Sequence, residues 1–177
     1  MKSIIVSIRP KWVEKIISGK KTIEVRKSAP KENPFRVYMY MTKDCKNMHD
    51  CGKVVGEFIC DNIIKWEYLP DCIFTDLKMY YISCADGIST CLSYSDIEDY
   101  GGGKTLYGWH ISDLKIYDKP KELSEFRPIC KFEGKDLICN LCPNHEYNGG
   151  LFFECRRKVT RPPQSWGYVE ELGDNNV

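Results

Sequence analysis

The hydrophobic pattern of this chain changes period at one glycine near the N-terminus, and this change constrains the fold more than any other feature. Before Gly19, the apolar residues of the stretch 10–17 recur at spacings of three and four, which predicts a helix with one apolar face. Pro10 suits the first helical position because it lacks an amide hydrogen. After Gly19, residues 21–26 alternate with a period of two, which predicts a strand. Its polar face carries Thr22, Glu24 and Arg26.

The rest of the chain adds further strands and a second helix. Ser93 and Asp96 form an N-terminal capping pattern for a short helix that the glycines at 101–103 end, and a run at 74–80 is compatible with another short helix. Short β-branched or aromatic runs predict strands at 3–8, 36–41, 54–61, 106–117 and 166–169. We therefore expect an α+β fold with a mostly antiparallel sheet.

The chain has 177 residues, a length typical of one domain. We expect a single domain over residues 1–172, with a Cys-rich insertion at about 128–158 and a frayed tail at 173–177. No stretch is apolar enough to span a bilayer, and the first residues do not form a signal peptide. Ten cysteines without a signal peptide indicate a reducing compartment, so we predict a cytoplasmic protein.

Positive charge is concentrated at the N-terminal end, although the whole chain has a net charge of only +1. Residues 1–36 contain ten Lys and Arg against three acids, which is 10 − 3 = +7, so the remainder carries +1 − 7 = −6. A local positive field attracts phosphates whatever the total charge. The alternative is a solvated helix face followed by a Lys-rich loop.

The Cys-rich insertion contains possible metal ligands. Cys139 and Cys142 form a CxxC pair, and Cys155 with either Cys130 or His145 completes the four ligands of a tetrahedral zinc site. The segment has too few apolar residues to order itself, so a structural zinc would supply that order. Unliganded thiols are the alternative, because one CxxC pair arises readily in a chain with ten cysteines.

The helix-glycine-strand unit at residues 12–26 resembles the signature of the ASCH (activating-signal-cointegrator homology) domains, which belong to the PUA-like superfamily. The stretches 52–58 and 107–111 extend the resemblance over roughly residues 1–123, and the ending at 161–169 is similar to that of phage and bacterial relatives. The resemblance implies a small mixed β-barrel with flanking helices. It also implies a cleft beside the helix-to-strand unit and RNA-related work, either binding or hydrolysis.

One bacterial ASCH group hydrolyses acetylcytidine, and its catalytic lysine aligns with Lys21. Its catalytic threonine aligns with Glu24, so this chain lacks the expected nucleophile. The resemblance therefore makes Lys21 a candidate catalytic residue and leaves the activity open.

The predicted ligand-binding residues have side chains suited to a nucleotide. Arg26 can bind phosphate with two donors, and Glu24 can accept from an exocyclic amine. The alternative is an exposed Glu24–Arg26 ion pair of little consequence. Trp109 is a candidate for base stacking, whereas Trp12 is expected in the core. The predicted set is Lys21, Thr22, Glu24, Arg26 and Trp109.

Three functions follow as hypotheses. The first is a binding module for RNA or a modified nucleoside. The second is a hydrolase acting on a modified nucleoside or on RNA. The third is a protein-interaction adaptor that uses the Cys-rich insertion.

Overall fold

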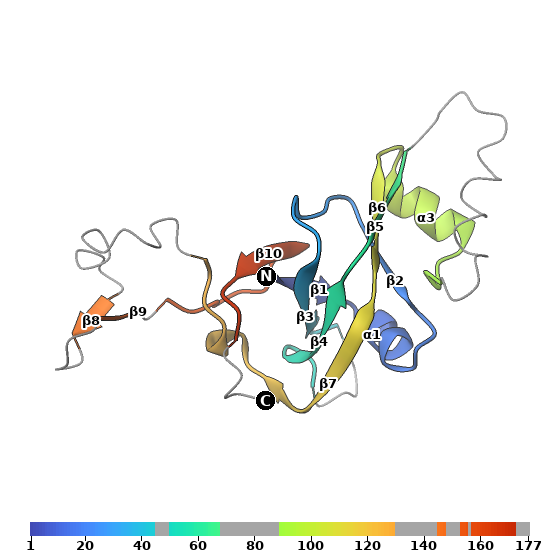
Figure 1. The fold of residues 1–177 in the computed structure, drawn as a ribbon. Coiled ribbons are helices and arrows are strands. Elements are labelled where there is room, and N and C mark those ends of the chain that lie inside the picture. Colours follow the sequence, from blue (N-terminus) through green and yellow to red (C-terminus); the bar gives the residue numbers. More distant parts are fainter. Residues whose placement is uncertain (45–49, 68–88, 130–144, 148–152, 156, 173–177) are drawn as a thin grey trace.

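The computed structural model describes residues 1–44, 50–67, 89–129, 145–147, 153–155 and 157–172. Its elements follow the chain in the order β1 (Lys2–Ile8), α1 (Pro10–Ile17), β2 (Ile23–Arg26), β3 (Phe35–Met41), β4 (Val54–Cys60), β5 (Ile63–Trp66), α3 (Tyr94–Gly101), β6 (Leu106–His110), β7 (Ser112–Lys121), a 3-10 turn (Leu123–Glu125), β8 (His145–Tyr147), β9 (Phe153–Cys155) and β10 (Trp166–Val169). The fold is mixed α+β (Figure 1).

The larger sheet has five strands in the order β10-β1-β3-β4-β7. Strands β1 and β3 are parallel, and the other neighbours are antiparallel. Alternate residues of β1 and β3 pack against α1, through Val13 and Ile16, to form the main core. The apolar face of α1 is therefore buried as its periodicity predicts.

The smaller sheet has three strands in the order β2-β6-β5. Only Asp61 and Asn62 separate β4 from β5, and only Ile111 separates β6 from β7. Strand β4 pairs with β7, and β5 pairs with β6. The segment β4–β5 therefore runs antiparallel to the segment β6–β7, and this pair of segments passes from the larger sheet into the smaller one. The strand predicted at 106–117 is accordingly divided in two.

The expectation of a closed β-barrel is wrong for the described residues. Within them β2 forms a ladder with β6 alone, so the two sheets do not close on each other. A side chain bridges the open side instead, because Arg26 of β2 donates from Nη2 to the carbonyl oxygen of Ser7 in β1, at 2.7 Å. The opening between β1 and β2 is where the candidate site lies.

Helix α3 begins and ends at the predicted residues. The hydroxyl of Ser93 accepts from the amide of Asp96 at 3.2 Å, and the Asp96 carboxylate accepts from the amide of Ser93 at 2.9 Å. This capping box satisfies two amides that the helix itself leaves unpaired. Gly102 ends the helix in the left-handed conformation, which glycine adopts without strain.

Several predictions lie largely outside the described residues, including the helix at 74–80 and most of the Cys-rich insertion. The described residues of the insertion include a two-stranded ladder, β8-β9, whose register pairs His145 with Cys155. Among the other cysteines, Cys60 and Cys91 are free thiols. Cys51 is disulfide-bonded, which departs from the expectation of reduced thiols.

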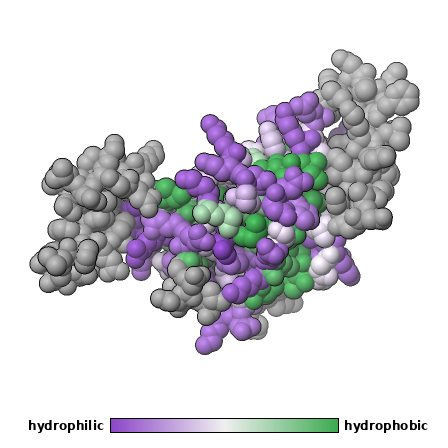
Figure 2. Space-filling model, viewed as in Figure 1, coloured by the Kyte–Doolittle hydropathy of each residue, from purple (hydrophilic) through white to green (hydrophobic). Residues whose placement is uncertain are grey.

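None of the described helices is long and apolar enough to cross a membrane. On the face drawn in Figure 2, hydrophilic residues surround smaller patches of hydrophobic ones.

Candidate functional site

The turn between α1 and β2 positions the candidate site. Gly19 follows the helix with a φ of +69°, a conformation that favours glycine, and the amide of Lys21 then donates to the carbonyl oxygen of Lys15 at 2.9 Å. The next residue, Thr22, exchanges two hydrogen bonds with Ser89. Its amide donates to the Ser89 carbonyl oxygen at 2.8 Å, and its hydroxyl accepts from the Ser89 amide at 2.8 Å. Thr22 thus holds the segment 89–92 over β2.

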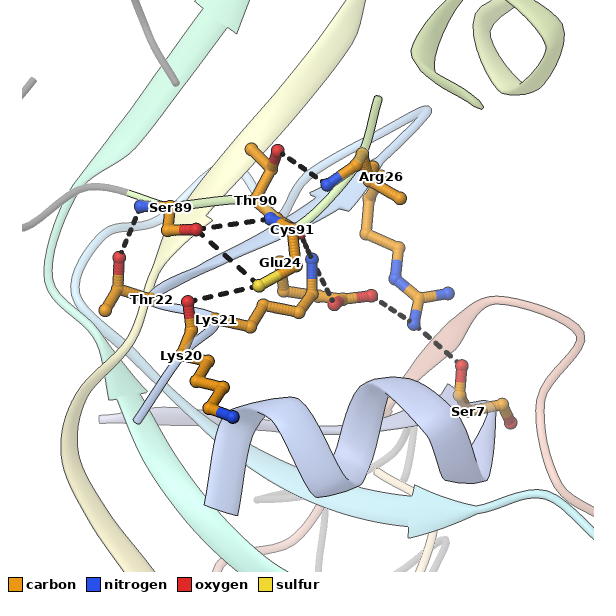
Figure 3. Close-up of polar contacts among 10 residues, drawn as sticks. Ser7, Lys20, Lys21, Thr22, Glu24, Arg26, Ser89, Thr90 and Cys91 are labelled. Carbon is orange, nitrogen blue, oxygen red and sulfur yellow. Dashed lines mark hydrogen bonds and ion pairs between the residues drawn. The ribbon is translucent and has the colours of Figure 1, made fainter. Parts of the chain in front are cut away.

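Lys21, Glu24 and Arg26 form a buried charged triad, with 3%, 5% and 7% of their surfaces exposed. Glu24 lies between the two cations (Figure 3): one carboxylate oxygen is 2.8 Å from Arg26 Nη2 and the other is 3.5 Å from Lys21 Nζ. Glu24 and Arg26 are therefore paired, as the alternative interpretation of the sequence held, but the pair is buried and not exposed.

Backbone oxygens complete the coordination of the two cations. Lys21 Nζ donates to the carbonyl oxygen of Thr90 at 2.7 Å, and Arg26 Nη2 donates to that of Ser7. Arg26 Nε is buried and makes no hydrogen bond within the described part of the chain. The two ends of the triad are thus tied to segments far apart in sequence.

Burial lowers the pKa of Lys21, because the ammonium loses water. The charge of Glu24 and its hydrogen bond with the ammonium oppose this shift by favouring the protonated amine. Two cations share one carboxylate, so the triad carries a net charge of 2 − 1 = +1 while Lys21 is protonated. This excess positive charge has no counterion within the triad.

The triad lines a pocket of about 380 Å³ beside α1, between β1 and β2. Arg9 and Lys11 add positive charge at its edge, and Asp96 adds a negative one. Counting all charged lining residues gives four cations and two carboxylates, or 4 − 2 = +2. Four of the ten basic residues in the N-terminal segment therefore gather at this pocket.

Trp109 does not lie where base stacking would need it, whereas Trp12 packs partly against the main core, as expected, and also reaches the pocket. Trp109 is fully buried in the central strand of the smaller sheet, where it packs edge-on against Phe35 at 5.3 Å between ring centroids, so it does not line the pocket. Trp12 is half-buried and forms part of the pocket wall. Lys21 Nζ lies 5.4 Å from the centroid of the Trp12 ring. Of these two tryptophans, Trp12 is therefore the one that lines the pocket.

Other lining residues were missed in the sequence. Tyr100 and Asp96 of α3 both line the pocket, and their spacing of four on a helix is the signal that could have placed them on one face. Gln164 and Ser165 come from the segment before β10. No comparable signal marks these two, because that segment reaches the pocket only through tertiary packing.

The zinc prediction is not tested by this structure. The described residues contain no group of three or more His, Cys, Asp or Glu side chains placed to hold a metal. Most of the predicted ligands, such as Cys139 and Cys142, lie outside the described residues.

Comparison with solved structures identifies similar folds. The crystal structure of ASCH from Zymomonas mobilis has a TM-score of 0.54 at 20% sequence identity, over 96% of this chain and 89% of that one. A tyrosine-to-phenylalanine mutant of the Zymomonas mobilis protein also gives 0.54 at 20% identity, over 97% and 92%. No curated protein sequence matches the chain.

Comparison with protein families gives one assignment. The model of the ASCH domain matches residues 6–113, which include α1, β2 and most of the pocket. The ASCH family is associated with RNA binding. Because the match covers more than half of the chain, this protein belongs to the ASCH domain family.

Proposed function

We propose that the protein binds RNA or a modified nucleotide in the pocket lined by Lys21, Glu24 and Arg26. The observation that carries the proposal is the excess positive charge of the buried triad beside a cavity of about 380 Å³. That volume falls within the range of small-molecule sites. A phosphate of the ligand would supply the missing negative charge.

Folding stability alone does not explain why three charged groups are buried together in the triad. Taking charges out of water costs several kcal/mol for each ion, and well-packed apolar side chains of similar volume often give equal or greater stability. Binding of a charged ligand explains the burial better. The carbonyl oxygens of Ser7 and Thr90 fix the two cations, so the charged groups do not have to reorganise when the ligand binds.

The wall of the pocket suits the other parts of a nucleotide. Trp12 offers an aromatic face, and stacking of a base on such a face contributes about 1 to 3 kcal/mol. Glu24 also lines the pocket, and its oxygens retain lone pairs that can accept from an exocyclic amine. We infer that the phosphate lies toward Arg26 and the base toward Trp12.

Hydrolysis of a modified nucleoside or of RNA is the second candidate. It is favoured by Lys21, since a lowered pKa increases the fraction of neutral amine that can accept a proton. Glu24 replaces the expected threonine nucleophile, so Lys21 would act as a base with water as the nucleophile. Lys21→Met separates the two functions: a binder loses affinity, whereas a hydrolase loses turnover at saturating substrate.

Direct binding measurements test the main proposal. Mixed-sequence single-stranded RNA should bind more weakly as salt rises, because phosphate neutralisation releases counterions. Binding to a protein partner that ignores both salt and Lys21 would favour the adaptor hypothesis.

Two further proposals accompany this function. We propose a structural zinc held by Cys139, Cys142, Cys155 and either Cys130 or His145; the register that pairs His145 with Cys155 supports it. We also propose that the protein acts in the cytoplasm, where RNA is available.

A further inference from the structure

A second pocket adjoins the first, and nothing in the proposed function uses it. It has a volume of about 610 Å³. Thr42, at the end of β3, lines both pockets. The segment between the insertion and β10 also runs along both: residues 158–160 and Pro162 line the second pocket, and Gln164 and Ser165 line the first. The two pockets are therefore neighbouring parts of one surface.

The second pocket has an apolar wall and two lysines. Leu123, Val159 and Pro162 contribute apolar surface. Lys43 and Lys158 are exposed and have no ion-pair partner among the described residues. Glu122, by contrast, lies 3.4 Å from Lys53 Nζ and is paired. The charged groups that line this pocket therefore sum to 2 − 1 = +1.

The side chain of Lys43 lies close to the backbone of Gly52. A Cβ atom on Gly52 would lie 2.9 Å from Cε and 3.2 Å from Cγ of Lys43, so the lysine stem lies directly on this glycine. Gly52 has a φ of +86°, a conformation that favours glycine. Because the aliphatic part of Lys43 lies against this backbone, its ammonium group can occupy fewer positions. Thr42 adds a buried hydroxyl that makes no hydrogen bond within the described residues.

We propose that this second pocket is a subsite for the neighbouring nucleotide of a single RNA strand, with Lys43 and Lys158 at its phosphate and the apolar wall under its sugar and base. The inference rests on the proposed function of the first pocket and narrows its ligand to a strand of two or more nucleotides. A free nucleoside or mononucleotide would fill only the first pocket.

The experiment compares chain lengths and lysine variants. Fluorescence anisotropy or calorimetry measures binding of a mixed-sequence RNA hexanucleotide, and calorimetry measures binding of the nucleoside 5′-monophosphates. The wild type should bind the hexanucleotide at least about tenfold more tightly. The double variant Lys43→Ala/Lys158→Ala should weaken hexanucleotide binding about tenfold at low salt and leave mononucleotide binding unchanged.

The salt dependence gives a second readout. Each phosphate neutralised on a single strand contributes about 0.7 to the slope of log affinity against log salt, so loss of the one phosphate site that the two lysines form should flatten the slope by about 0.7. The matched control is Lys115→Ala/Lys119→Ala, which removes the same charge from exposed positions on β7 outside both pockets. Thr160→Glu, at another exposed lining residue, should also weaken hexanucleotide binding by repulsion.

The outcomes separate the inference from the proposed function. If Arg26→Gln weakens hexanucleotide binding while the Lys43/Lys158 double variant behaves like its control, the subsite is wrong and the first pocket stands. If neither change alters hexanucleotide binding, or the hexanucleotide does not bind at low salt, both proposals are overturned. If the double variant weakens the mononucleotide as much as the hexanucleotide, the second pocket is not a separate subsite.

Discussion

Arg26 Nη2 donates to the carbonyl oxygen of Ser7 at 2.7 Å, and this contact joins the edge strand of the smaller sheet to a strand of the larger one. The same nitrogen lies 2.8 Å from Glu24. Arg26 therefore has two roles: it links the two sheets, and it belongs to the buried charged triad. Changes to the triad should therefore affect both stability and ligand binding.

Glu24→Gln should destabilise the protein. Glutamine keeps the shape but removes the one negative charge between Lys21 and Arg26, and leaving buried charge uncompensated costs about 3 kcal/mol. Urea unfolding measures the loss. The control is Glu67→Gln, because the Lys65–Glu67 pair is exposed and its removal should change the free energy of unfolding little. Equal effects of the two substitutions would contradict the burial of the triad.

Glu24→Gln should also change ligand preference if the carboxylate contacts a base. The preference among RNA homopolymers should shift, because Gln offers a donor as well as an acceptor. The slope of affinity against salt should keep its value, since no phosphate contact is lost. An unchanged preference would remove Glu24 from base recognition.

The lowered pKa of Lys21 predicts a pH dependence of stability. The unfolded chain binds the Lys21 proton more tightly than the folded one, so between the lowered folded pKa and the unfolded value of 10.5 the unfolded state carries more protons. The contribution of Lys21 to stability therefore rises with pH through this window. The free energy of unfolding of the wild type minus that of Lys21→Met should increase from pH 7 toward pH 10. A constant or falling difference would contradict the desolvation of Lys21.

The two tryptophans should respond differently to substitution. Trp12→Leu should weaken RNA binding by about 1 to 3 kcal/mol, because it removes the stacking surface of the pocket. Trp109→Phe is the contrasting variant; it should lower stability, since Trp109 is fully buried, and leave RNA affinity unchanged in the folded protein. Equal losses of affinity would mean that Trp12 acts only through the fold.

The two tryptophans also mark how far the sequence could predict the site. The helix-glycine-strand unit is local, so α1, Gly19 and β2 followed from periodicity alone. The capping box of Ser93 and Asp96 could likewise be predicted from the sequence, because its two residues are only three positions apart. Which tryptophan lines the pocket depends on how the smaller sheet packs against the larger one, and no local pattern encodes that.

The burial of the triad could not be predicted for the same reason. Alternation in residues 21–26 places Glu24 and Arg26 on a polar face, which normally faces water. Here that face is covered by a segment more than sixty residues later, through Thr90, and by the side chains of α3. The barrel predicted from family resemblance does not close within the described residues: Arg26 reaches Ser7 with its side chain, and no backbone ladder joins β2 to β1 there.

The metal proposal makes a simple analytical prediction. Protein purified without chelator should carry about one zinc per chain, in a four-coordinate, sulfur-rich site. Elemental analysis measures the metal content, and Cys139→Ser/Cys142→Ser should abolish it. Zinc-free native protein, or zinc retained by the double variant, would contradict the proposed ligands.

The most direct test of the central claim is the salt dependence of single-stranded RNA binding by the wild type and Arg26→Gln. This variant leaves Lys21 and Glu24 as a balanced pair, so the protein should remain folded, which circular dichroism checks. Arg36→Gln is the matched control, because Arg36 is paired with Glu57 and Glu171 and lies outside the pocket.

We predict that Arg26→Gln weakens binding to all RNA sequences about tenfold at low salt and flattens the salt slope by about 0.7, the value for one phosphate contact. Arg36→Gln should match the wild type. RNA binding that is absent at low salt, or that is the same in the wild type and Arg26→Gln, would contradict a nucleic-acid site at this triad.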